Sequence, residues 1–322
     1  MENIEKLMER ENTEYYSGRG KHIYYDFKTF AASKKLGKAC AIEFMESAQI
    51  AEGELRVYEI GVGGGTFALN FLKNLARMDP TIAKNVTYVL WDVSSKLLDE
   101  AEEKLGNFAI EKVHAQAEET SKMKNAFWIR GNEILDDIPA RVFLRKGEKV
   151  YEVGINNGEW CATEQSTAPK AVLEYMQKMP QEYWIPINLR AAKLIGSWKE
   201  QLQKGGKISM LDYGFANPAE IEEPPEIWND SVIRKYGGEY TVDVNFDFLL
   251  KKAGGQLETQ DEFVNAKLGE TSFAVEQNDC MDYLDSSEIE AERKNLEKEG
   301  YDIDLLKRGK ESNPYFHYSI ST

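Results

Sequence analysis

Residues 55–65 read LRVYEIGVGGG, a β-rich run that ends in a cluster of glycines. Apolar residues at helical spacing follow over residues 66–77, so the stretch is typical of a strand, a tight turn and a helix. Glycines in such a turn can adopt positive φ and let the backbone approach a ligand, while amides at the helix start attract an anionic group. The stretch therefore predicts an α/β fold with a ligand-binding loop.

Further apolar runs end in polar or glycine residues, as strands of a parallel sheet do. They cover residues 86–90, 126–129 and 207–211, and an alternating run over residues 315–320 suits a final strand. Strands that alternate with helices predict a mainly parallel sheet with helices on both faces. Ligands of such sheets bind beyond the carboxyl ends of the strands, so chemistry is expected there.

A long stretch lies between the runs at residues 126–129 and 207–211. Its first half has the character of a β-hairpin around Asn157 and Gly158. Apolar residues three or four apart then predict a helix over residues 189–202, which Gly205 and Gly206 close. We expect an insertion at about residues 140–188 on the ligand side of the sheet, a helical or lid segment over residues 1–50, and a main domain over residues 51–322.

Composition excludes several classes of protein. The chain has 322 residues, 42% of them hydrophobic, which indicates a folded globular protein. Lys and Arg number 40 against 55 Asp and Glu, and the net charge of -15 disfavours general binding to nucleic acid or anionic lipid and favours a basic partner. No apolar run is long enough for a membrane span, and the first ten residues are densely charged, so we expect a cytoplasmic protein.

The cysteines and histidines give no support for metal chemistry. Three of each are present, far apart and without zinc-ligand or triad spacing, so we expect no metal site.

Glu59, beside the glycine loop, bears on the choice of ligand. It would repel a pyrophosphate, and Thr66 stands where the dinucleotide fingerprint needs Gly or Ala, which disfavours NAD. The aminium and sulfonium groups of S-adenosylmethionine are cationic, and Glu59 can complement them. S-adenosylmethionine is therefore the predicted occupant. Asp92, after the second strand, is placed to accept hydrogen bonds from both ribose hydroxyls, or alternatively to cap the following helix in competition with Ser94 or Ser95.

Several short motifs in a fixed order resemble those of the MidA-type family of S-adenosylmethionine-dependent methyltransferases, which includes a mitochondrial arginine methyltransferase needed for respiratory complex I assembly. The resemblance extends over about residues 15–255. It comprises the glycine loop, D-F-x-T at residues 26–29, N-E-x-x-D-x-x-P at 132–139, D-Y-G at 212–214 and G-E-x-T-x-x-V-x-F from 238. It implies a Rossmann-like class I methyltransferase with a mainly parallel seven-stranded sheet and an inserted substrate-side subdomain.

The resemblance also implies roles for individual residues. Those expected to bind the cofactor are Asp26, Thr29, Glu59, Gly61, Gly63, Gly65, Asp92, Gln116 and Asn132. Two carboxylates must hold and polarise a guanidinium acceptor, because its ordinary pKa exceeds 12. The expected catalytic residues are Glu133 and Asp136, with Asp212 and Tyr213 opposite, and a structural role for each stays open.

The function implied is methylation of a protein side chain, arginine by the resemblance, in a basic protein or peptide. Two alternatives stay open: a small-molecule O- or N-methyltransferase, and an assembly factor that binds S-adenosylmethionine without turnover. The acceptor, the number of methyl groups added and a homodimeric state are not decided by the sequence.

Overall fold

The computed structural model describes residues 1–19, 34–49, 53–164, 168–269 and 315–322. Asp26 and Thr29, two expected cofactor residues, lie outside the described residues.

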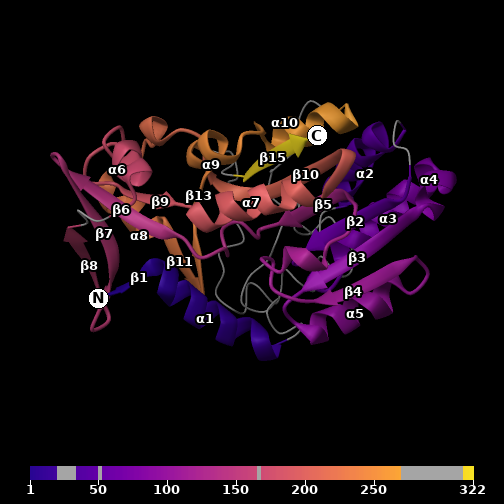
Figure 1. Ribbon diagram of the computed structural model, residues 1–322, viewed down its shortest axis with the longest axis horizontal. Coiled ribbons are helices and arrows are strands. Elements are labelled where there is room, and N and C mark those ends of the chain that lie inside the picture. The colour runs from indigo at the N-terminus through magenta and orange to yellow at the C-terminus, as the bar shows by residue number, and fades with distance from the viewer. Residues whose placement is uncertain (20–33, 50–52, 165–167, 270–314) are drawn as a thin grey trace, which may run out of the picture.

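A mainly parallel sheet forms the centre of the described structure (Figure 1). Its seven strands follow the order β14-β15-β10-β5-β2-β3-β4, with the two-residue strand β13 beside β10. The bounds are β2 Leu55–Ile60, β3 Val86–Asp92, β4 Ile110–His114, β5 Ala126–Asn132, β10 Leu202–Phe215, β13 Val244–Asn245, β14 Gln256–Thr259 and β15 Tyr315–Ser321. The β15 strand is antiparallel to both neighbours, and the other pairs are parallel. The predicted fold class is confirmed, and every predicted strand of the main sheet is present.

Helices cover both faces of this sheet. On one face lie α2 Lys34–Ala48, α3 Thr66–Met78, α4 Pro80–Lys84, α5 Ser95–Leu105 and α10 Gln260–Leu268. On the other lie α7 Leu189–Gln201 and α9 Phe246–Ala253, with the 3-10 turn η3 Thr120–Lys122 near α7. Phe71 and Trp128 are fully buried in the first layer, and Trp198 is fully buried in the second. These apolar side chains recur at helical or strand spacing, which is why each element buries one face.

The end of α7 differs from the prediction. The helix stops at Gln201, and Leu202 instead pairs with Ala126 as the first residue of β10. Leu202 matches the helical stripe by spacing alone, but the neighbouring strand supplies backbone partners that a longer helix would leave unpaired.

A second, antiparallel sheet precedes α7 in the chain and lies at the opposite end from α4 (Figure 1). Its strands are β1 Glu2–Asn3, β6 Arg141–Lys146, β7 Lys149–Asn156, β8 Glu159–Glu164 and β9 Trp184–Ile187, with helix α6 Lys170–Met176 packed on it. Asn157 and Gly158, both at positive φ, connect β7 to β8 and confirm the predicted hairpin. The segment between β10 and β13 forms η4 Pro218–Glu220, α8 Pro225–Ser231 and the hairpin of β11 Ile233–Tyr236 with β12 Glu239–Val242.

Helix α1 (Ile4–Arg19) joins the two sheets. Its first half packs Ile4 and Met8 into the core of the second sheet, and its second half brings Tyr15 against Leu97 of α5. In Figure 1 the helix runs from the second sheet toward α5. The chain's first helix therefore lies along the ligand side of the molecule.

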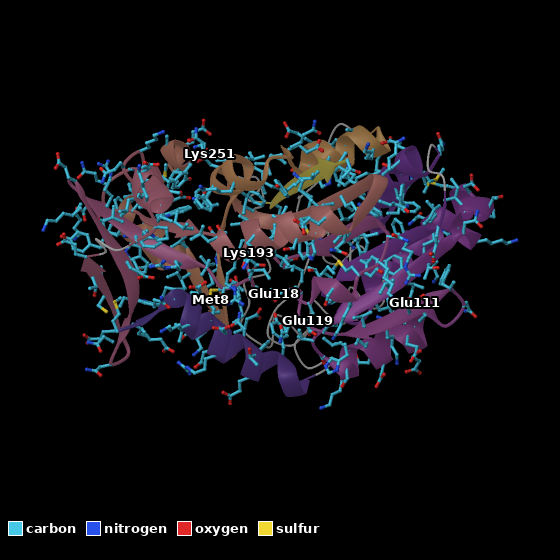
Figure 2. All side chains as sticks on the ribbon, viewed as in Figure 1. Met8, Glu111, Glu118, Glu119, Lys193 and Lys251 are labelled. Atoms are coloured by element: carbon cyan, nitrogen blue, oxygen red, sulfur yellow. The ribbon has the colours of Figure 1, made fainter. Side chains whose placement is uncertain are left out.

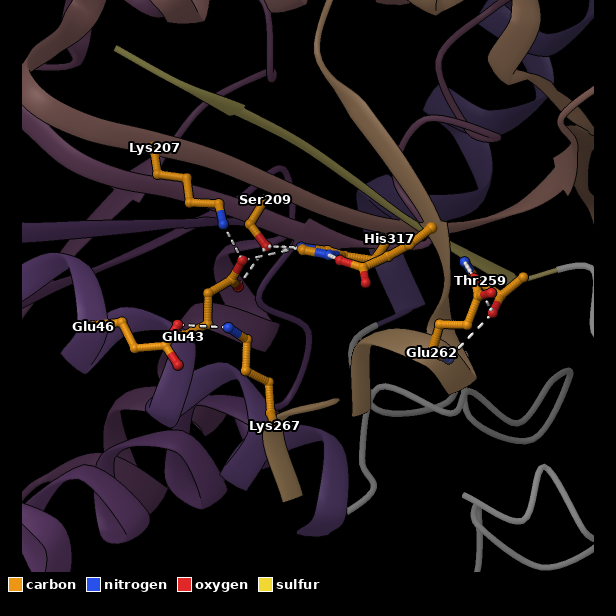
Figure 3. Close-up of polar contacts among 9 residues, drawn as sticks. Glu43, Glu46, Lys207, Ser209, Thr259, Glu262, Lys267 and His317 are labelled. Atoms are coloured by element: carbon orange, nitrogen blue, oxygen red, sulfur yellow. Dashed lines mark hydrogen bonds and ion pairs between the residues drawn. The ribbon is translucent and has the colours of Figure 1, made fainter. Parts of the chain in front are cut away.

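A buried polar network fixes β15 to the sheet (Figure 3). One ring nitrogen of His317, Nε2, lies 2.8 Å from Ser209 Oγ and 3.3 Å from a carboxylate oxygen of Glu43, while Nδ1 lies 3.0 Å from Glu258. Lys207 completes the group through an ion pair with Glu43. Burial opposes ionisation of Glu43, but His317 and Lys207 outweigh it and lower the pKa of this carboxyl.

We expect His317→Ala to lower the free energy of unfolding by about 2 kcal/mol, because it leaves buried polar partners unsatisfied. Urea denaturation would measure the change, with His114→Ala, at an exposed histidine, as the control. The lowered pKa of Glu43 gives the pH dependence: its contribution to stability is present above pH 4.5, its ordinary value, and declines as the pH falls further. Equal stability of His317→Ala and wild type would show that the network contributes nothing.

Candidate active site

The glycine loop after β2 has a backbone that only glycine adopts without strain. Gly61, Gly63 and Gly65 have φ values of 66°, 54° and 73°. A Cβ atom at Gly61 would lie 2.1 Å from Ile134 Cδ1, and one at Gly65 would lie 2.9 Å from Ala101. The first of these contacts also shows that the segment after β5 packs directly against the loop.

The fold itself uses most of the loop amides. The amides of residues 61–62 donate to the carbonyl oxygen of Trp91, and the amide of Gly63 donates to Asp92 at 3.1 Å. The amide of Gly65 donates to the carbonyl oxygen of Val62 within the loop. These four amides are therefore already satisfied by the fold, and the expected cofactor contacts of Gly61, Gly63 and Gly65 stay predictions. The first turn of α3 begins directly after Gly65, and its amides have no partner within the helix, so an anionic group fits there.

Asp92 lies at the end of β3 and shapes the loop. Its two carboxylate oxygens accept from the amides of Gly63 and Ser94, at 3.1 and 2.8 Å. The capping role falls to Ser94, which accepts from Leu97 in the first turn of α5. Burial raises the pKa of Asp92. The ribose role of Asp92 stays a prediction.

Gln116 and Asn132 follow or end strands at the same edge of the sheet. Gln116 comes shortly after β4 and is exposed. Its backbone carbonyl oxygen accepts from Trp91 Nε1 at 3.2 Å. Asn132 is the last residue of β5, and its Oδ1 is buried without a hydrogen-bond partner in the described structure. Their predicted contacts with the cofactor stay predictions, and Asn132 has an acceptor atom available for one.

Glu59 lies beneath the loop rather than in it. One carboxylate oxygen accepts from Arg130 Nη1 at 2.8 Å and the other from the hydroxyl of Tyr88 at 2.8 Å. The side chain is buried among the residues that α3 covers, and burial raises its pKa to about 7 although Arg130 and Tyr88 act in the opposite direction. Its charge is therefore already opposed by a cation of the protein.

Asp212, at the end of β10, holds the segment that follows β5. Its Oδ2 accepts from the amides of residues 134–136, at 3.0, 2.7 and 3.3 Å, and its Oδ1 accepts from its neighbour Tyr213. Glu133 begins this segment at a φ of 49°, and its amide donates to Leu211 at 2.8 Å. Both oxygens of Asp212 accept from backbone amides, so Asp212 positions the segment that carries Glu133 and Asp136, and its expected catalytic role stays a prediction.

Three carboxylates meet beside this segment, and we refer to Asp136, Asp137 and Glu239 as the carboxylate cluster. Asp136 and Glu239 are 3% and 2% exposed. Burial raises the pKa of Asp136 to about 7, and burial together with Glu239 raises that of Asp137 well above its ordinary value. Oδ1 of Asp136 and Oδ1 of Asp137 are buried without a hydrogen-bond partner. No Lys or Arg of the described chain forms an ion pair with the cluster.

Tyr213 lies beside the cluster and donates its hydroxyl to Thr241 at 2.6 Å. The guanidinium of Arg234, which pairs with Asp243, stacks 4.8 Å from the centre of the Tyr213 ring. Burial and the nearby Asp136 raise the pKa of Tyr213, so it stays protonated. The structure thus brings Glu133, Asp136, Asp212 and Tyr213 together, while their chemical roles stay predictions.

Asp137, Glu239 and Tyr16 were not among the expected site residues. Asp137 lies within the motif at residues 132–139 and Glu239 within the motif from residue 238, but the sequence gives neither of them a role. Tyr16 has no sequence signal, because its partners are 121 and 223 positions away.

The sheet order, the glycine loop and the acidic carboxyl edge define a class I S-adenosylmethionine-dependent methyltransferase. The model of a family described as "Putative S-adenosyl-L-methionine-dependent methyltransferase" matches residues 36–254, more than half of the chain. The chain belongs to this family, and S-adenosylmethionine is its cofactor.

Two crystal structures of proteins from Burkholderia thailandensis are similar in fold. A native form has 17% sequence identity, and a form bound to S-adenosyl-homocysteine has 18%. For both, the match covers 99% of this chain and 87% of the other, with a TM-score of 0.67. No curated protein matches the chain. Within the described residues, no group of three or more His, Cys, Asp or Glu side chains is placed to hold a metal ion, and no helix has the length and hydropathy to cross a bilayer.

Proposed function

We propose that the chain methylates a nitrogen atom of an arginine side chain in a basic protein or peptide. The observation that carries this proposal is the carboxylate cluster, which has two buried oxygens without partners and no cation paired to it in the described structure. A guanidinium offers a positive charge and several N–H donors to such oxygens. The net charge of -15 supports a basic partner in the same way.

The protein itself contributes little covalent chemistry to methyl transfer. When bound, S-adenosylmethionine supplies an electrophilic methyl group on a sulfonium. Transfer would form an N–C bond from the nitrogen lone pair and break the C–S bond, whose electron pair would stay on sulfur. Asp136 and Asp137 would accept hydrogen bonds from the N–H groups of the guanidinium, and Asp136 would accept the proton that the nitrogen loses. Packing of Ile134 against Gly61 keeps this pair beside the cofactor loop.

The test is incubation of the purified chain with methyl-labelled S-adenosylmethionine and a cell lysate, followed by mass spectrometry. Label in methylarginine residues of proteins is the expected result. Label only in low-molecular-mass products would favour a small-molecule methyltransferase. No transfer despite cofactor binding, together with unchanged partner capture by Asp136→Asn, would favour a binding protein without turnover.

The raised pKa of Asp136 predicts the pH dependence of the reaction. Because the carboxyl titrates at about 7, it is protonated below that pH and can accept a proton only above it. We expect kcat/KM for a protein acceptor to rise between pH 6 and pH 8 and then to level off. In Asp136→Asn this rise should be absent and kcat/KM at pH 8 about tenfold lower, since Asp137 and Glu239 remain.

Asp230→Asn, at an exposed aspartate of α8, is the matched control and should keep the wild-type profile. An unchanged rise in Asp136→Asn would assign the titration to another group and remove Asp136 from the reaction.

A further inference from the structure

Three segments far apart in the sequence meet at the hydroxyl group of Tyr16. Tyr16 belongs to α1, and its oxygen lies 2.8 Å from Asp137 Oδ2 and in hydrogen-bond contact with Glu239 Oε1. Asp137 follows β5 of the main sheet, and Glu239 begins β12. The first helix, the segment after β5 and the hairpin of β11 with β12 are thus connected through one atom.

The hydroxyl of Tyr16 has one hydrogen but two carboxylate partners. Burial and both carboxylates raise the pKa of Tyr16, so the phenol keeps its hydrogen. It can donate to only one of the two oxygens, and the other contact needs a hydrogen carried by a carboxyl group. Burial and Glu239 raise the pKa of Asp137, which favours the hydrogen on that carboxyl group. Tyr16 therefore bridges Asp137 and Glu239 by accepting the hydrogen of one carboxyl group and donating its own to the other.

Other contacts of α1 fix the position of Tyr16. The side-chain amide of Asn12 makes two hydrogen bonds of 2.8 Å to the backbone of Tyr240, the residue after Glu239. Arg190, at the start of α7, bonds Glu9 on α1 and Glu118 after β4. In the view of Figure 2, Glu118 and Met8 of α1 lie close together, and Arg190 links Glu118 to Glu9 of the same helix. Tyr16 is therefore presented by a helix held at both the hairpin and the main sheet.

We propose that Tyr16 is a positioning residue of the acceptor site, whose hydroxyl joins Asp137 to Glu239 and holds the carboxylate cluster in the arrangement that receives a cationic nitrogen group. The proposal rests on the proposed function. It adds that the first helix, which precedes the matched family region, completes the acceptor site. Tyr16 acts through the two carboxylates and has no direct part in the transfer.

The test compares wild type, Tyr16→Phe, Glu239→Gln and the double variant. The probes are the peptide acetyl-Gly-Gly-Arg-Gly-Gly-amide and its lysine counterpart, titrated calorimetrically into the protein saturated with S-adenosyl-homocysteine, and then used as acceptors with S-adenosylmethionine. In Tyr16→Phe we expect Kd and KM for the arginine peptide to rise about tenfold, with kcat changed less than about threefold. The affinity for S-adenosyl-homocysteine should stay within about twofold. The double variant should bind the peptide no more weakly than Glu239→Gln, because residues that act as one unit are not additive.

Tyr318→Phe is the matched control, because it removes the phenol hydrogen bond to the carbonyl oxygen of Gly254 without touching α1 or a carboxylate of the cluster. It should lower the melting temperature and leave KM unchanged. If Tyr318→Phe raises KM as much as Tyr16→Phe, or if the two changes at Tyr16 and Glu239 are additive, the positioning role is overturned. Methylation by wild type with an unaffected Tyr16→Phe variant would overturn this proposal alone. Peptide binding that is weakened in Tyr16→Phe, without methylation by wild type, would overturn the arginine reaction alone. Failure of wild type to bind either peptide would overturn both.

Discussion

Asp212→Ala is expected to lower kcat/KM for methyl transfer about 10³-fold, because catalysis depends on the placement of groups within about 1 Å. Asp212 accepts three amides of residues 134–136, whereas Leu211 of the same strand holds only the first residue of the segment, through the amide of Glu133. Glu133 and Asp136 would lose their positions together. The glycine loop keeps its own hydrogen bonds to Trp91 and Asp92, so Kd for S-adenosyl-homocysteine should rise less than about fivefold.

The same substitution should also reduce stability, since buried amides left without an acceptor cost about 1–3 kcal/mol each. Activity and cofactor binding are therefore measured at a temperature where circular dichroism shows the variant folded. Asp79→Ala is the matched control: Asp79 also accepts two amides, of Thr81 and Ile82 at 2.9 Å, but at the start of α4. It should cost stability and leave kcat/KM unchanged. Activity of folded Asp212→Ala within tenfold of wild type would refute the anchoring role.

The strands and the class of fold could be predicted because their signals are local. Residues 55–60 and 126–129 are apolar runs that end in glycine or polar residues, and this pattern depends only on neighbours in the chain. The end of α7 could not be predicted, because Leu202 fits both the helical stripe and the strand. Only the position of Ala126 on the neighbouring strand decides between them.

The site was predictable in its location but not in the roles of its carboxylates. A carboxylate after a strand looks the same in sequence whether it faces a substrate, as Asp136 can, or accepts backbone amides, as Asp212 does. The difference is that the amides of residues 134–136, which are 76 to 78 positions away in the sequence, donate to Asp212. Tyr16 is the extreme case, since its partners come from two distant segments and its own surroundings in sequence carry no motif.

The role of Glu59 could likewise not be predicted from the sequence alone. The substitution Glu59→Gln is the second with a large expected effect. Its partner Arg130 is fully buried, with its guanidinium 3.3 Å from the centre of the Phe67 ring. Nε and Nη2 of Arg130 have no hydrogen-bond partner in the described structure, so Glu59 provides the only carboxylate that this cation contacts there. We expect Glu59→Gln to lower the free energy of unfolding by about 3–5 kcal/mol at pH 8, because an unpaired charge would remain buried.

The double variant Glu59→Gln, Arg130→Met should recover most of that loss, since it removes the cation with the anion. Glu54→Gln, at an exposed carboxylate paired with Arg56, is the matched control and should change stability by less than about 1 kcal/mol. Urea denaturation monitored by tryptophan fluorescence measures all three. A double variant as unstable as Glu59→Gln would show that the pair is not what stabilises this part of the core.

The same variants separate a structural role of Glu59 from a role in cofactor recognition. S-adenosylmethionine carries a sulfonium charge that S-adenosyl-homocysteine lacks, so the ratio of their Kd values reports the field at the sulfur. Because Arg130 balances the charge of Glu59, the double variant should keep this ratio within about twofold of wild type. A tenfold loss of selectivity for S-adenosylmethionine would mean that Glu59 acts on the sulfonium despite Arg130. In that case Glu59 would be a determinant of cofactor recognition, and the glycine loop would serve mainly to hold the ligand at the right distance.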